Sequence, residues 1–335
     1  PGPETLTAPH EAKNIISVAS TSSHRGGGMI DEVSGFSSRG PARDGRIAPT
    51  VAAPGGTVVS TRSLPASAVC NEPPTDGNSF GLYGVCSGTS MAAPHVTGAV
   101  ALVTQWWRNR TVGLSPSPAL TKALLVNTAT DMAIPDVPNA NEGWGRVDLG
   151  ALFDPTAKRT YVDQRWVFTD LGERRVFTVK PADPTRPLKV TLAWTDAPGT
   201  PQADPTAPAL VNDLDLVVEG QKATYLGNNF ADGASVAGGA ADRLNNVESV
   251  YLRAPGSKKL RVVVQAANLP SDGVPGTGDA TDQDFALVIS NAVEEIPPPA
   301  ALGEPYASYS FDAGTQGWTT TGVPTWSRSA PGATA

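Results

Sequence analysis

The run Ser-Gly-Thr-Ser-Met-Ala-Ala-Pro-His-Val-Thr-Gly, from Ser87 to Gly98, contains the residue types most suited to chemistry in this sequence. Small residues precede Ser90, and a mainly apolar stretch follows it with almost no charge before Arg108. A stretch that is apolar on nearly all sides predicts a buried helix, and Pro94 is tolerated in its first turn. The free N–H groups and the positive dipole end of a helix N-terminus favour developing negative charge. The pattern therefore predicts a nucleophilic serine, Ser90, at the start of a buried helix.

The segment Gly88–Val96 resembles the nucleophile signature of the subtilisin-like serine proteases, Gly-Thr-Ser-Met-Ala-(Ala/Ser/Thr)-Pro-His-Val. The resemblance implies that Ser90 is the attacking serine, that its own N–H is one oxyanion donor, and that Thr89 supports the oxyanion hole. His95 lies five residues after Ser90 on the same expected helix. A general base must lie within about 3 Å of the nucleophile, and the resemblance makes His95 a packing residue instead.

Four further motifs carry the same resemblance in the order typical of the family. They are Asn14–Ala19, Phe36–Pro41, Ile47–Gly55 and Gly143–Asp148. Thr50 stands where the family usually has aspartate, so a cation contact of that aspartate is not expected here. The resemblance implies an α/β domain with a parallel sheet.

The other members of the catalytic triad are not found in their family contexts. In this family the aspartate and the histidine precede the serine, but neither His10 nor His24 lies in a His-Gly-Thr context and no Asp-(Ser/Thr)-Gly precedes them. The segment with the oxyanion asparagine is also missing. We therefore expect the chain to be the C-terminal half of a catalytic domain, inert by itself, from a serine endopeptidase that acts on polypeptides through an acyl-enzyme and needs no catalytic cofactor. The missing N-terminal half is its expected partner.

Two other classes of function stay open at this point. In one, the parent is a pseudoprotease with a degenerate triad and a binding or scaffolding role. In the other, the β-rich half is a substrate-binding or adhesion module beside a vestigial catalytic half. The intact nucleophile segment favours the protease over both.

Pattern changes along the chain predict its domain organisation. Residues 1–154 alternate short apolar strands with helices, which is typical of a parallel sheet covered by helices. Within them, Ser117 and Pro118 are suited to the N-cap and first position of a helix. Asp154-Pro155 marks a boundary.

Beyond this boundary the periodicity changes to two. Residues 155–295 are expected to form an antiparallel β-sandwich, and they resemble the jelly-roll domain of some secreted subtilases. Residues 296–309 are expected to be a proline-rich linker, and residues 310–335 the start of a truncated third β module. The expected strands of the sandwich are 174–179, 188–194, 214–218, 247–252, 260–264 and 285–289.

Composition restricts the remaining classes. The net charge of −7 and the lack of a Lys/Arg cluster argue against nucleic-acid binding, and no apolar stretch is long enough to span a membrane. The only two cysteines, Cys70 and Cys86, lie 16 positions apart before Ser90. They are either a disulfide or two unpaired thiols. A disulfide would indicate an oxidising compartment, and we expect a secreted, extracellular protein.

A polar pattern within the β-rich half suggests structural calcium. Asp213 and Asp215 alternate with leucines, so both carboxylates should lie on one face of a strand. Together with Asn212, and with Asp196 as a further donor, they could supply several oxygen ligands for calcium. The alternative is a polar strand face whose carboxylates are paired with N–H groups or arginines.

Overall fold

The structure of the polypeptide chain is a computed structural model. The structure describes residues 3–24, 27–62, 70, 82–111, 113–132, 136–201 and 204–294. The predicted linker (296–309) and third module (310–335) lie outside these residues. Residues 1–296 form one compact unit.

Two short parallel strands and one long helix form the framework around the predicted nucleophile. β1 (Val18–Thr21) pairs in parallel with β2 (Val51–Pro54), with Val18 opposite Val51. A hairpin of β3 (Val58–Thr61) and β4 (Tyr83–Cys86) follows, and then comes α1 (Thr89–Arg110). The larger parallel sheet that the resemblance implies is represented, among the described residues, by β1 and β2 and by a parallel bridge from Ala52 to Arg146.

Two shorter helices follow α1. α2 (Pro118–Thr128) begins as the sequence predicts, because the Ser117 hydroxyl accepts a hydrogen bond of 2.9 Å from the backbone N–H of Leu120, and Pro118 takes the first helical position. α3 (Leu149–Phe153) is a single turn capped by Asp148. In the part of the chain described, no helix combines the length and apolar character needed to cross a membrane.

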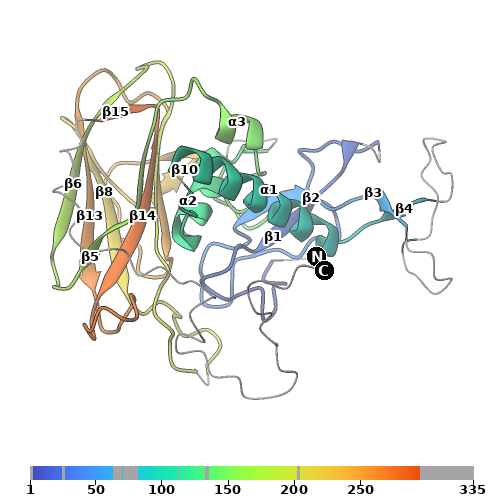
Figure 1. Cartoon of the computed structure of the whole chain (residues 1–335), viewed down its shortest axis with the longest axis horizontal. Helices are drawn as coiled ribbons and strands as arrows, with labels where there is room; N and C mark the ends of the chain where they lie inside the picture. Colours follow the sequence, from blue (N-terminus) through green and yellow to red (C-terminus); the bar gives the residue numbers. More distant parts are fainter. Residues whose placement is uncertain are drawn as a thin grey trace, which may run out of the picture. The chain divides into compact units, whose positions relative to one another are not determined.

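Two antiparallel sheets make up the second half of the unit (Figure 1). The four-stranded sheet has the order β12-β7-β14-β5, and the five-stranded sheet has the order β15-β6-β13-β8-β9. β10 and β11 form a separate small hairpin. The predicted strands are confirmed within a few residues at their ends, whereas β5, β9, β10, β11 and β15 were not predicted. The strands are β5 (Arg159–Phe168), β6 (Arg174–Pro181), β7 (Leu188–Ala193), β8 (Asp213–Glu219), β9 (Thr224–Leu226), β10 (Phe230–Ala231), β11 (Ala234–Ser235), β12 (Val247–Leu252), β13 (Leu260–Asn268), β14 (Gln283–Ser290) and β15 (Ala292–Glu294).

Alternate side chains of both sheets form one apolar core. Trp194, Phe168 and Phe285 are its largest fully buried members, and leucines and valines from β7, β8, β13 and β14 surround them. Burying this many aliphatic and aromatic side chains is the dominant favourable term in folding. This burial of alternate side chains explains why the alternation of apolar residues could be recognised in the sequence.

A second core crosses the boundary that the sequence suggests near residue 154. Helix α2 packs on β7 and β14, and Figure 1 shows α2 beside β14. Nearly every residue of this helix is buried. The Asn127 side chain donates hydrogen bonds to the backbone carbonyls of Lys189 and Val288 at 3.2 and 3.3 Å, and the Tyr251 hydroxyl donates to the carbonyl of Val126 at 3.1 Å. The helical part and the four-stranded sheet therefore share buried surface.

Candidate functional site

Ser90 lies where the parallel strands meet helix α1. Strand β2 ends at Pro54, and the backbone N–H of Gly88 donates a 2.8 Å hydrogen bond to the carbonyl oxygen of Gly55. A Cβ atom at Gly55 would lie 2.6 Å from the Gly88 carbonyl oxygen, so only glycine allows the two backbones to come this close. This contact holds the segment before Ser90 against the end of β2.

The N-terminus of helix α1, next to Ser90, has no side-chain cap. Gly88 provides no side-chain cap, and the first turn contains no acidic residue. The side chains of Thr89 and Ser90 are both exposed. The first N–H groups of a helix lack intrahelical partners, so the backbone here can stabilise negative charge next to the Ser90 hydroxyl. The location agrees with the geometry expected of a nucleophile, while the catalytic role of Ser90 and the supporting role of Thr89 stay predictions.

Helix α1 is not buried on all sides, contrary to the expectation from its apolar sequence. One face is buried, against β1, β2 and α2, and it consists of Ala92, Val96, Ala99, Val103 and Trp107. The opposite face is exposed, and Leu102 keeps 48% of its surface in contact with solvent. The prediction was wrong because apolar composition shows which residues can be buried, whereas burial also needs a packing partner on each side.

The three histidines occupy separate positions. His95 is exposed on α1, and its Nδ1 lies 2.8 Å from the carbonyl oxygen of Met91, one turn earlier on the helix. Its exposure does not match the packing role that the resemblance implies. His10 Nδ1 lies 3.0 Å from the Thr7 carbonyl oxygen, and His24 follows the end of β1.

A disulfide joins Cys70 to Cys86 in the structure. Cys86 ends strand β4, four residues before Ser90. A Cβ atom at Gly84 would collide with the carbonyl oxygen of Cys70, so glycine is also needed where the two segments approach each other. The bridge therefore lies in the hairpin that leads directly to the nucleophile segment.

The two aspartates of β8 lie on one face, as the sequence predicts, and they share an arginine. Arg243 Nη1 donates to Asp213 Oδ2 at 2.8 Å and also to Asp215 Oδ1. Glu248, from β12 in the other sheet, completes a group of three carboxylates. One oxygen atom of each of these carboxylates lies within 4.8 Å of the others. The name "inter-sheet acid cluster" is used below for Asp213, Asp215 and Glu248.

The other two residues expected to join a calcium site are used elsewhere. The Asn212 amide donates to the carbonyl oxygens of Ser271 and Asp282 at 2.9 and 3.0 Å. Asp196 pairs with Lys13 at 2.5 Å and accepts the backbone N–H of Asn212 at 2.7 Å. Asn212 and Asp196 are therefore engaged in other contacts, and their part in a calcium site stays a prediction.

Sequence reasoning missed Glu248 and Arg243. The sequence did contain a signal for Glu248, because it is the one charged residue in the segment Val247–Leu252. In the structure every residue of this strand is buried. Burial raises the pKa of Glu248 well above its ordinary value, and burial also raises the pKa of Asp213 to about 6, against the opposing effect of Arg243. The hydrogen bond with Asp215 raises the pKa of Arg243.

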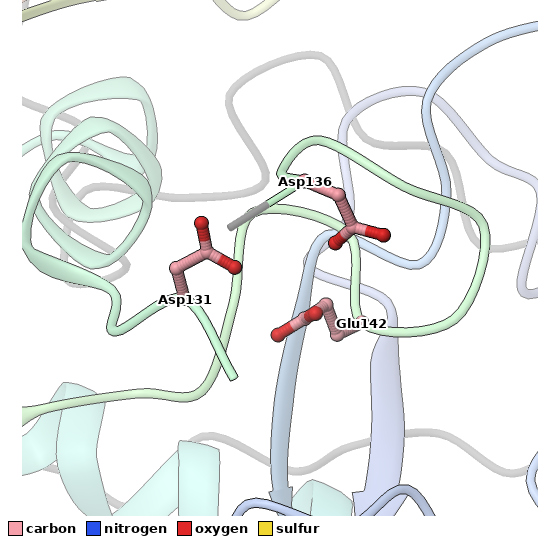
Figure 2. Close-up of side chains that lie close together, drawn as sticks. All are labelled: Asp131, Asp136 and Glu142. Atoms are coloured by element: carbon pink, nitrogen blue, oxygen red, sulfur yellow. The ribbon is translucent and has the colours of Figure 1, made fainter. Parts of the chain in front are cut away.

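A second group of three acids lies in the loop after α2. Asp131, Asp136 and Glu142 point toward one another in Figure 2. Both oxygens of Glu142 accept hydrogen bonds, from the backbone N–H of Met132 and from the Asn139 amide, each at 3.0 Å. Burial is the main cause of the raised pKa values of Asp131 and Glu142.

Comparison with known proteins finds a family similar to the first part of the chain. Residues 1–145 match the model of the subtilase family. The chain is 32% identical over 240 residues to the serine protease/ABC transporter B family protein tagA of Dictyostelium discoideum, covering 65% of the chain and 13% of tagA. This match covers more of the chain than residues 1–145 alone, so the similarity continues into the β-rich half.

Shorter matches link the chain to other proteases. It is 38% identical over 108 residues to the subtilisin-like protease SBT4.15 of Arabidopsis thaliana, covering 32% of the chain and 13% of that protein. It is also 43% identical over 76 residues to the minor extracellular protease Vpr of Bacillus subtilis, covering 22% of the chain and 8% of Vpr. The chain thus spans only a small part of the length of the curated relatives it matches.

Proposed function

Because residues 1–145 match the model of the subtilase family, we propose that this chain carries the nucleophile of a serine endopeptidase and that Ser90 is that nucleophile. The observation that carries the proposal is the exposed position of Ser90 in the first turn of α1, held against β2 by the hydrogen bond between Gly88 and Gly55. The proposed substrate is a polypeptide. No metal or organic cofactor takes part in the proposed bond cleavage.

The proposed reaction is acyl transfer in two steps. The Ser90 hydroxyl oxygen attacks the scissile carbonyl, and its proton passes to a histidine that an aspartate orients. The backbone N–H of Ser90, with support from Thr89, stabilises the oxyanion. Collapse of the tetrahedral intermediate releases the amine, which takes the proton from the histidine, and water then hydrolyses the acyl-enzyme by the same route.

The base is proposed to come from a further segment of the same or another chain that covers the exposed face of α1. His95 is bound to the preceding helical turn, and His10 lines a pocket to which Ser90 does not contribute. Several exposed residues of α1 that follow the nucleophile are small or apolar, among them Ala93, Gly98, Ala101 and Leu102. Such a face is suited to close packing against another segment. Residues 1–335 alone are therefore proposed to be inert.

An extracellular location is part of the same proposal. The disulfide between Cys70 and Cys86 would be stable in an oxidising compartment. The relative Vpr is described as an extracellular protease. A jelly-roll topology for the β-rich half is likewise proposed, and the two antiparallel sheets around one core are consistent with it.

Labelling with a fluorophosphonate probe tests the proposed function. The 335-residue chain alone should neither react rapidly with the probe nor hydrolyse casein. When combined with a segment carrying the aspartate and histidine motifs of the family, it should do both, and the Ser90→Ala variant should do neither. A matched Ser87→Ala variant should keep the activity, because Ser87 lies outside the proposed site and its hydroxyl accepts the backbone N–H of Thr57.

Two results would contradict the proposal in different ways. Hydrolysis by residues 1–335 alone that depends on Ser90 would show that the chain supplies its own base. A complemented protein that folds but neither reacts nor cleaves would favour the pseudoprotease or binding-module alternative.

A further inference from the structure

We propose that the inter-sheet acid cluster, Asp213, Asp215 and Glu248, binds a calcium ion that displaces Arg243 from the carboxylates and ties the two β-sheets together. Asp213 and Asp215 come from β8 of the five-stranded sheet, and Glu248 comes from β12 of the four-stranded sheet. The inference is independent of the proposed protease activity.

The spacing of the donor atoms suits a hard cation. Calcium binds six to eight oxygens at about 2.3–2.6 Å, so two of its ligand atoms can be separated by up to about 5 Å. The cluster offers one oxygen from each of three carboxylates, all within 4.8 Å of one another. It offers no nitrogen or sulfur donor, which favours calcium over zinc or copper.

Two buried carboxylate oxygens in the cluster have no hydrogen-bond partner in the part of the chain that the structure describes. They are Oδ1 of Asp213 and Oε1 of Glu248. These residues keep only 5% and 1% of their surface exposed. A buried carboxylate oxygen without a partner is costly, and such atoms call for a compensating ligand.

The backbone around Glu248 leaves space for a buried carboxylate. A Cβ atom at Gly227 would lie 2.8 Å from the Glu248 Cβ and would collide with its carboxylate. The other Glu248 oxygen, Oε2, accepts the backbone N–H of Leu216 at 2.7 Å, which fixes the orientation of the side chain. The carboxylate is therefore held in place before any ion arrives.

Arg243 supplies a positive charge to only part of the cluster. Its guanidinium contacts Asp213 and Asp215, and it leaves the two oxygens named above unpaired. The Arg243 side chain is 53% exposed, whereas the Asp213 and Asp215 side chains are only 7% and 15% exposed. Removing the guanidinium from these carboxylates is costly unless another cation takes its place. A divalent ion can take that place and can also contact the third carboxylate.

The acid group in Figure 2 is a poorer candidate. Both oxygens of Glu142 already accept hydrogen bonds, and Asp136 is exposed and accepts from the Asn139 amide at 2.7 Å. It nevertheless provides a matched control, because it also contains three carboxylates within 4.8 Å.

Isothermal titration calorimetry and thermal unfolding of the EDTA-treated, complete 335-residue chain test the proposal. Calcium chloride should bind with one site, and it should raise Tm by about 5 °C or more at a hundredfold excess over Kd. The isosteric Glu248→Gln variant should bind at least tenfold more weakly. Arg243→Gln should bind up to about fivefold more tightly, since it removes the competing cation. Glu142→Gln should bind like the wild type.

Each alternative result overturns the assignment. Absence of calcium-dependent heat and of any Tm shift at millimolar calcium would show that Arg243 is the sole counter-charge. Unchanged binding by Glu248→Gln, or lost binding by Glu142→Gln, would place the ion elsewhere. The far-UV circular dichroism of Glu248→Gln in EDTA shows whether this variant is folded. If it is not, Asp215→Asn, at the partly exposed edge of the cluster, replaces it with the same expected loss.

Discussion

Replacing Asp284 by asparagine should change the pH dependence of stability. Asp284 lies in β14 with 5% of its surface exposed. Its Oδ2 accepts a 2.6 Å hydrogen bond from the Gln164 amide, while Oδ1 has no partner within the described part of the chain. Burial raises the pKa of Asp284 to about 7, the Gln164 hydrogen bond opposes this shift, and the nearby Asp163 and Asp282 carboxylates add to it.

The direction in which stability changes with pH follows from the folded and unfolded pKa values of the Asp284 carboxyl group. The ordinary value is 3.8 and the folded value is about 7, so the folded state holds a proton that the unfolded state has lost. The contribution of Asp284 is therefore fully present below pH 3.8 and is lost as the pH rises through 7. A difference of about three pKa units, at about 1.4 kcal/mol each, corresponds to at most about 4 kcal/mol. Asparagine cannot ionise, so Asp284→Asn should be more stable than the wild type at pH 8 by up to this amount.

Urea denaturation at pH values from 4 to 8.5, followed by tryptophan fluorescence, measures the effect. The free energy of unfolding of Asp284→Asn, minus that of the wild type, should increase as the pH rises from 4 and level off once the pH exceeds the folded pKa of about 7. Asp183→Asn is a control of opposite sign, because hydrogen bonds from Thr185 lower the pKa of Asp183, and it should not stabilise the protein at pH 8. A pH-independent difference for Asp284→Asn would refute the reasoning.

Further predictions concern local structure and buried groups. Ser117→Ala should cost about 1 kcal/mol of unfolding free energy through loss of the α2 N-cap, and an unchanged urea midpoint would contradict the cap. Leu124→Ala should cost about 2–5 kcal/mol, because Leu124 is fully buried in the core shared by α2 and the four-stranded sheet; a loss below 1 kcal/mol would argue against that core. Reduction should lower stability by about 3 kcal/mol if Cys70 and Cys86 are bridged, and alkylation of both thiols in the native, unreduced protein, seen by mass spectrometry, would exclude the bridge. Burial lowers the pKa of Lys122 from 10.5 to about 7, so wild-type stability should rise between pH 7 and 10.5; Lys122→Met should flatten that rise, and an equal slope in both proteins would count against a buried amine.

Short-range patterns determined much of the local structure. The N-cap of α2 and the strands of both sheets were predictable because capping and strand alternation depend on residues close together in the sequence. Strand β5 was missed, and its structure shows the reason. Gln164 adopts a positive φ of 48°, and the register with β14 shifts between Asp284 and Ala286, so the strand has no continuous period of two.

Packing between distant segments decided the features that the sequence did not show. Apolar composition alone predicted that α1 is buried all round, but only one of its faces has partners in the structure. The core shared by α2 with β7 and β14 was likewise not readable from either segment, because a buried surface is defined by both of its sides.

The inter-sheet acid cluster shows the same difference between what the sequence determines and what the packing determines. The alternation of Asp213 and Asp215 with leucines placed both carboxylates on one face, and the structure agrees, since Arg243 contacts both of them. The sequence around them carried no information on Glu248, which comes from the other sheet. The identity and spacing of neighbouring residues determined the nucleophile segment and the strand faces. Tertiary structure decided which of these groups meet, because Asp215 and Glu248, 33 residues apart in the sequence, come together only when the two sheets pack.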